Sequence, residues 1–221
     1  MSYGTRNTNN TTKRTLNMKK TANAKPQLAI AEALDEIYGA VKNSRQASVT
    51  VISRYTAAIA VNFTDWMGKT LPWARHPYAQ FVLKDNLCCE ATEDHVGMLH
   101  KFAHDCGALP RYQHHQWTHV EVTHIRRLLA DPVSAGLAGV ALCAILETAS
   151  ESFIPDLAER AAECGCRDLT YTNTHGAADI EHSRAFLKAL ELESRMGYQD
   201  PQFTIRCAAD FAADLFEKIY K

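Results

Sequence analysis

The sequence predicts an all-α protein built as a bundle of about six to eight helices. From Pro26 onward, apolar residues recur at intervals of three and four, which is the spacing of a buried helix face. Prolines and glycines interrupt this pattern at distances typical of helix boundaries, and no segment shows the strict alternation of a strand. With 221 residues, 46% of them hydrophobic, the chain can form a substantial core.

Residues 1–25 differ from the rest of the chain. They are polar, basic and poor in large apolar side chains, so we expect a disordered N-terminal tail followed by one helical domain over residues 26–221. The net charge of −1 gives no reason to expect a nucleic-acid or anionic-membrane partner. Neither an uninterrupted apolar span nor a signal-peptide core is visible, so we expect a cytoplasmic protein without a membrane partner.

The first helix is expected over residues 28–38, where Leu28, Ile30 and Leu34 belong to one helical pattern. The same periodicity, with many small residues, predicts a second helix over residues 47–66.

The helical pattern is broken over residues 68–73, and Pro77 suits the first turn of a new helix. We expect that helix to run through residues 76–106 and to end at Gly107.

Four further helical segments are expected in the second half of the chain. They cover residues 114–129, a stretch opened by Pro132 and bent or restarted at Pro155, and then residues 173–196 and 201–220. The histidines of the first of these segments are expected on a polar surface, with a zinc site as the alternative.

The most informative motif is His175, Asp179 and His182, spaced His-x3-Asp-x2-His. At about 100° per residue, all three side chains leave one narrow stripe of a helix. Two imidazoles and one carboxylate form a ligand set suited to redox iron, with positions left open for oxygen. The alternative is a polar helix face that happens to carry two histidines.

Glu147 follows a long apolar run, so its carboxylate is expected to point inward. A buried glutamate is rare unless it is paired or binds a metal. The alternative is a solvated position at the edge of the helix, and Glu151, one turn later, could play either part. Gly136, Gly139 and Ala144 on the same segment predict close packing against a neighbour.

A second set of metal-ligand candidates lies on the 76–106 segment, with Glu90, Glu93, His95 and His100 close together. Glu93 and His100 are seven residues apart and share a helix face. Glu90 and His95 differ by about 140° on a straight helix and meet only across a π-bulge or a break. Helix geometry alone therefore favours His100 as the histidine ligand.

In this combination the chain resembles the haem-oxygenase-like di-iron oxidases and oxygenases. Asn86-Leu87 precedes Glu90, and His95 stands twelve residues before Gly107, as the corresponding histidine does in that family. The resemblance therefore favours His95 over His100. It implies a haem-oxygenase-like bundle and six metal ligands, which are Glu90, His95, Glu147, His175, Asp179 and His182.

The resemblance also implies a function. Two Fe(II) ions would activate O2, the co-substrate, through a peroxo intermediate and oxidise or fragment a small substrate. That substrate would be an amino acid or a derivative in specialised metabolism, and the outcomes include C–C cleavage, N-oxygenation, desaturation, and alkene or nitrile formation.

The resemblance further divides the ligands between the two ions. One iron would take Glu90, His95 and a bridging Glu147, and the other would take the three residues of the closing motif together with Glu147. No catalytic residue is assigned beyond the metal ligands. A homodimer is possible.

Two other functions remain open from the sequence. A metal-free, thiaminase-like enzyme would use Cys143 or Cys88 as its nucleophile. A haem-binding bundle would need one proximal histidine and a broad apolar slot. The odd count of seven cysteines and the missing signal peptide favour reduced thiols.

Overall fold

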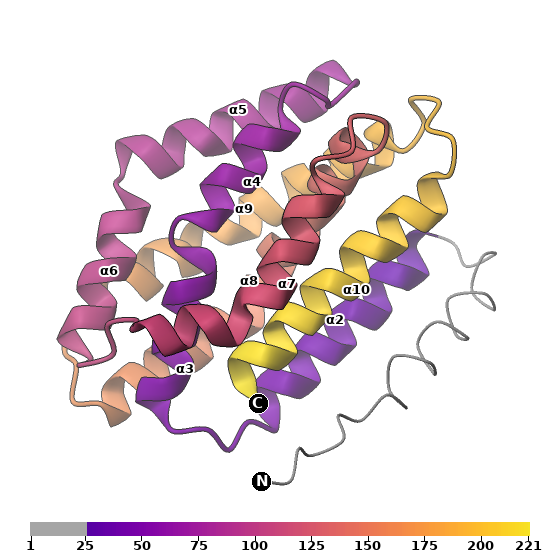
Figure 1. Cartoon of the computed structure of the whole chain (residues 1–221). Coiled ribbons are helices and arrows are strands. Elements are labelled where there is room, and N and C mark those ends of the chain that lie inside the picture. The colour runs from indigo at the N-terminus through magenta and orange to yellow at the C-terminus, as the bar shows by residue number, and fades with distance from the viewer. Residues whose placement is uncertain (1–25) are drawn as a thin grey trace, which may run out of the picture.

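The computed structural model describes residues 26–221, apart from the side chains of Pro26, Ala177 and Ala178. This part of the chain is all-α and contains nine helices, arranged as a bundle (Figure 1). The expected tail over residues 1–25 lies outside the described residues. The helices are α2 (Pro26–Lys42), α3 (Ser48–Ile59), α4 (Asn62–Thr70), α5 (Pro77–Thr92), α6 (His95–Asp105), α7 (Tyr112–Leu128), α8 (Ala135–Glu163), α9 (Thr170–Glu193) and α10 (Pro201–Tyr220).

Helix α8 is the central element of the bundle. It packs most extensively against α9 and also contacts α2, α3, α4 and α10, while α2 and α10 lie side by side (Figure 1). By length and apolar composition α8 could cross a membrane, but 83% of its apolar 18-residue window is buried inside the protein. Its hydrophobicity is therefore accounted for by the neighbouring helices.

Close packing at the start of α8 is confirmed. A Cβ added to Gly139 would lie 1.7 Å from Thr70 Oγ1, and one added to Gly136 would lie 2.2 Å from the carbonyl oxygen of Trp73. Glycine at these two positions lets the end of α4 approach α8.

Two segments expected as single helices are divided, which raises the number of helices above the six to eight predicted. The 47–66 segment ends one helix at Ile59 and starts another at Asn62. The 76–106 segment breaks after Thr92, because Asp94 adopts a left-handed backbone conformation with φ of 51°. The Asp94 side chain then accepts a hydrogen bond from the backbone N–H of Gly97 and begins α6.

Pro155 does not restart a helix, since α8 continues through it. A proline leaves the carbonyl four residues earlier without its helical donor. Pro155 and Glu151 are both exposed, so water can satisfy that carbonyl.

A buried carboxylate fixes α5 against α9. Glu193, near the end of α9, accepts hydrogen bonds from the backbone N–H groups of Arg75 and His76, each at 2.7 Å, and from the hydroxyl of Tyr198. This contact sets the start of α5 beside the end of α9, and these two helices carry four of the six metal-ligand candidates.

Candidate metal centre

Six side chains from four helices converge at one cavity, in two groups of three. Within each group, one potential ligand atom per residue lies within 4.8 Å of the others. The six are the residues expected from the sequence. Glu90, His95 and His175 form the first group, and Glu147, Asp179 and His182 form the second.

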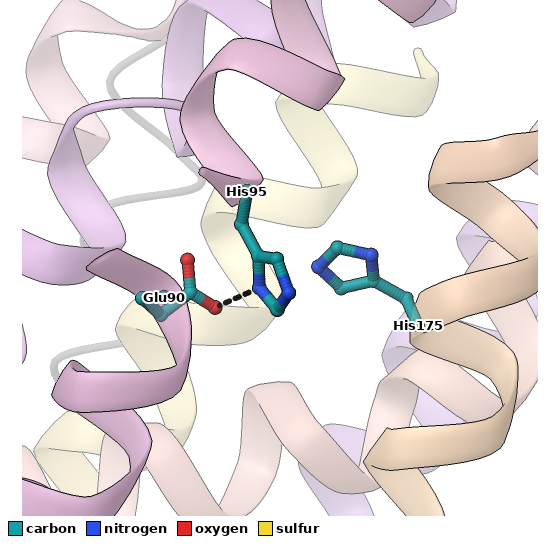
Figure 2. A group of neighbouring side chains, drawn as sticks. All are labelled: Glu90, His95 and His175. Atoms are coloured by element: carbon teal, nitrogen blue, oxygen red, sulfur yellow. Dashed lines mark hydrogen bonds and ion pairs between the residues drawn. The ribbon is translucent and has the colours of Figure 1, made fainter. Parts of the chain in front are cut away.

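The first group joins three helices, α5, α6 and α9 (Figure 2). His95 Nδ1 lies 3.0 Å from Glu90 Oε1, and the imidazole rings of His95 and His175 lie 4.5 Å apart. The break between α5 and α6 supplies the departure from straight-helix geometry that this pairing requires. His100, which helix periodicity favoured, is half-buried and does not line the cavity.

The second group is more deeply buried. Glu147 is 5% exposed and Asp179 is 6% exposed, and His182 Nδ1 lies 3.8 Å from Glu147 Oε2. The carboxylate of Glu147 accepts one long hydrogen bond, 3.5 Å from Asn86 Nδ2. Glu151 is exposed and belongs to neither group.

His175 belongs to the first group, so the two groups differ from the division that the family resemblance implied. Helix rise explains the difference. Residues seven apart on one stripe are separated by about 10 Å along the axis, so their side chains enter the cavity at different levels. His175 therefore reaches Glu90 and His95, while Asp179 and His182 remain together.

The two carboxyl groups of the second group ionise less readily than ordinary carboxyl groups in the metal-free protein. Burial, followed by the nearby charges of Asp179 and Glu90, raises the pKa of Glu147 well above its ordinary range. Burial likewise raises the pKa of Asp179 to about 7. None of the described residues that line the cavity is a lysine or arginine. A bound cation is therefore what would let both carboxylates ionise.

The histidines are suited to metal binding in different ways. Burial lowers the pKa of His175 and of His182, which favours the neutral imidazole that binds metal. The hydrogen bond to Glu90 raises the pKa of His95 to about 9, so a metal ion must displace a proton there. His175 Nδ1 donates to the carbonyl of Tyr171 at 2.9 Å, which leaves Nε2 for a metal.

The donor set fits two divalent cations, because it supplies three carboxylates and three imidazoles in two compact groups. The cavity beside them has a volume of about 50 Å³. The hydroxyl groups of Tyr55 and Tyr171 meet at 2.9 Å in its wall. Tyr55 was missed from the sequence, since it lies in an unremarkable helical run. The apolar wall includes Ile59, Phe63, Leu146, Phe153, Ile154 and Phe216.

The alternative functions lack a comparable site. Cys143 is fully buried, and burial raises the pKa of its thiol well above the usual range, while Cys88 is exposed. Neither cysteine lines the cavity. A cavity of about 50 Å³ is far too small for a haem group.

Comparison with known families gives an independent result. A haem-oxygenase-like family model, described as an iron-containing redox enzyme, matches residues 50–212. The matched range includes all six residues of the two groups and more than half of the chain. Searches of curated proteins and of solved structures returned no significant match.

Proposed function

The chain belongs to the family of iron-containing redox enzymes, and from that premise we propose that it is a non-haem di-iron oxidase or oxygenase that uses O2. One observation carries the proposal. Two groups of carboxylate and imidazole ligands face one cavity, and no lysine or arginine in the described cavity wall balances the buried carboxylates of the second group.

Each group would hold one iron. Glu90, His95 and His175 would hold the first ion, and the second would be held by Glu147, Asp179 and His182. Bound ferrous iron supplies the electrons that O2 needs before it can oxidise an organic substrate. The protein contributes the arrangement of ligands, the charge that balances the ions, and a cavity wall that restricts water.

The substrate that we propose is a small amino acid or a derivative, oxidised or fragmented in specialised metabolism. The small cavity supports a small substrate. In its wall, the Tyr55 and Tyr171 hydroxyls share one hydrogen bond. The second O–H of the pair would then be available to donate to an oxygen atom of the substrate.

Anaerobic loading with Fe(II), followed by metal analysis and O2 consumption with a panel of amino acids and fatty acids, tests the proposal. We expect about two irons per chain and O2 uptake that one substrate class stimulates. Asp179→Asn should lose both properties. Glu181→Gln, an exposed change on the same helix, is the matched control.

Wild-type protein that binds less than about one iron per chain, and consumes no O2 with any member of the panel, would reject the di-iron assignment. Full iron loading of Asp179→Asn would reject the second group as the site of the second ion.

A further inference from the structure

His95 lies between two carboxylates, of which only one belongs to a metal-ligand group. Its Nδ1 atom is 3.0 Å from Glu90 Oε1, and its Nε2 atom is 3.0 Å from Glu93 Oε2. Glu90 can join His95 and His175 around a cation, whereas Glu93 is not part of either group. The two nitrogens of one imidazole therefore face two different kinds of partner.

We infer that Glu93 is a positioning residue, which accepts the Nε2–H of His95 and so directs the Nδ1 lone pair of His95 toward the metal. The inference rests on the proposed function, since it concerns the first of the two iron sites. A neutral imidazole has one protonated nitrogen and one free nitrogen, and only the free one binds a metal. A carboxylate that accepts the other N–H fixes the tautomer and the ring orientation and makes the ligand more basic.

The position of Glu93 in the chain supports this role. Glu93 ends α5, Asp94 follows in its left-handed conformation, and His95 begins α6. The same break that turns His95 toward Glu90 also places Glu93 against the opposite edge of the ring. The side chain of Glu93 is 53% exposed, whereas that of His95 is 5% exposed. Glu93 therefore keeps contact with solvent while it contacts a buried ring.

The other histidine of the first group is held in an analogous way. His175 Nδ1 donates to the backbone carbonyl of Tyr171 at 2.9 Å, which leaves its Nε2 for the metal. The carbonyl of Tyr171 and the carboxylate of Glu93 thus each accept an N–H from a ligand histidine, the first from Nδ1 and the second from Nε2. One acceptor is part of the helix, while the other is a side chain that substitution can remove.

Anaerobic titration with Co(II), followed by visible absorption, measures the contribution of Glu93 without any turnover. Removing a carboxylate that orients a ligand histidine typically weakens metal binding by about 10–100-fold, and we expect this for one of two ions in Glu93→Ala. Glu93→Gln keeps an acceptor oxygen and should lose less. Asp85→Asn removes an exposed carboxylate that lies on the same helix and belongs to neither ligand group, so it should leave both affinities unchanged.

The protonated nitrogen can be observed directly in the wild-type protein. In Zn(II)-loaded protein with ¹⁵N-labelled histidine, long-range ¹H–¹⁵N spectra should show that His95 carries its proton on Nε2. Glu93→Ala should broaden or shift that signal, and Glu93→Gln should largely restore it.

Either of two results overturns the inference about Glu93. One is a proton on Nδ1 of metal-bound His95, and the other is equal Co(II) affinity in Glu93→Ala and Asp85→Asn. Both results leave the di-iron proposal intact, provided that the wild-type protein binds two ions. Wild-type protein that binds neither Co(II) nor Fe(II) overturns both proposals together.

Discussion

Two buried glutamates of this protein differ in how many hydrogen bonds their surroundings donate to them. Glu193 is fully buried and accepts hydrogen bonds from two backbone N–H groups and from the hydroxyl of Tyr198. Glu147 is almost equally buried, yet its carboxylate accepts one long hydrogen bond, from Asn86. The first carboxylate is therefore stabilised by the protein itself, and the second is not.

The difference separates a structural carboxylate from one that ionises readily only beside a cation. A buried carboxylate costs free energy unless donors or positive charge replace its lost hydration. Glu193 has its donors in the metal-free protein and joins α5 to α9. Glu147 has Asp179 and Glu90 as neighbours, which increase the cost of its charge. A proton or a bound cation removes that cost, so loss of the carboxylate should destabilise the metal-free protein at Glu193 but not at Glu147.

The largest expected effect is that of Glu147→Gln on iron binding. Because even partners of metal ligands contribute about 10–100-fold to affinity, loss of a ligand should cost more than about 100-fold and reduce O2 consumption to background. The metal-free protein should unfold at an unchanged or higher temperature, since the amide replaces a carboxyl that already favours its neutral form.

Metal analysis and thermal unfolding with a chelator measure these two properties separately. Glu151→Gln, an exposed change one turn later on α8, is the control and should retain both iron and activity. Normal iron loading of Glu147→Gln would contradict the comparison.

The second effect concerns Glu193→Ala, which should destabilise the metal-free protein by about 3 kcal/mol. The substitution leaves buried donors without an acceptor, and each such loss typically costs about 1–3 kcal/mol. Urea unfolding measures the change. Glu191→Ala, on the exposed face of the same helix, should have a much smaller effect, because its ion pairs with Lys188 and Arg195 lie at the surface. Equal losses in the two variants would show that the buried hydrogen bonds of Glu193 are unimportant.

The part of the candidate metal centre on α9 was predictable from the sequence, because a continuous helix preserves its periodicity. His175, Asp179 and His182 lie on one stripe, and all three face the cavity. The all-α fold follows from the same periodicity, and the family match supports it. Glu147 was recognisable because a carboxylate within an apolar run has few other roles.

The part on α5 and α6 was not predictable from helix geometry. The break occurs at Asp94, with no proline or glycine beside it, and a left-handed aspartate is not visible in a periodic pattern. Periodicity therefore favoured His100, and only the family resemblance favoured His95. The placement of His175 with Glu90 also depends on how α5 and α9 pack, which spacing along one helix does not determine.

The third effect is a loss of metal-free stability as the pH rises from 7 to 9. The pKa of His95 is about 9 in the folded protein, against 6.5 for an unperturbed histidine, so its contribution is fully present below 6.5 and disappears as the pH approaches 9. The change should be roughly 1–2 kcal/mol. Chelator-treated protein unfolded in urea at each pH measures it. His95→Gln should make the profile less steep, and the remaining slope comes from Glu147 and Asp179, whose raised pKa values also cost stability as the pH rises. Stability that rises over this interval in the wild-type protein would contradict the claim that protonated His95 stabilises the metal-free fold.

The smallest expected effect is that of Tyr198→Phe, which removes one of the three donors to Glu193. The arginine–aromatic contact remains, because the guanidinium of Arg75 lies 3.9 Å from the centre of a ring that phenylalanine preserves. We therefore expect a loss of about 1 kcal/mol in urea unfolding, the net value of one hydrogen bond, with iron affinity unchanged. In the Glu193→Ala background the same substitution should cost less, because only the longer contact of the hydroxyl with the Trp73 carbonyl oxygen, at 3.4 Å, remains. A full loss in that background would mean that the Tyr198 hydroxyl acts through the Trp73 carbonyl, and that Glu193 is less completely satisfied than its surroundings indicate.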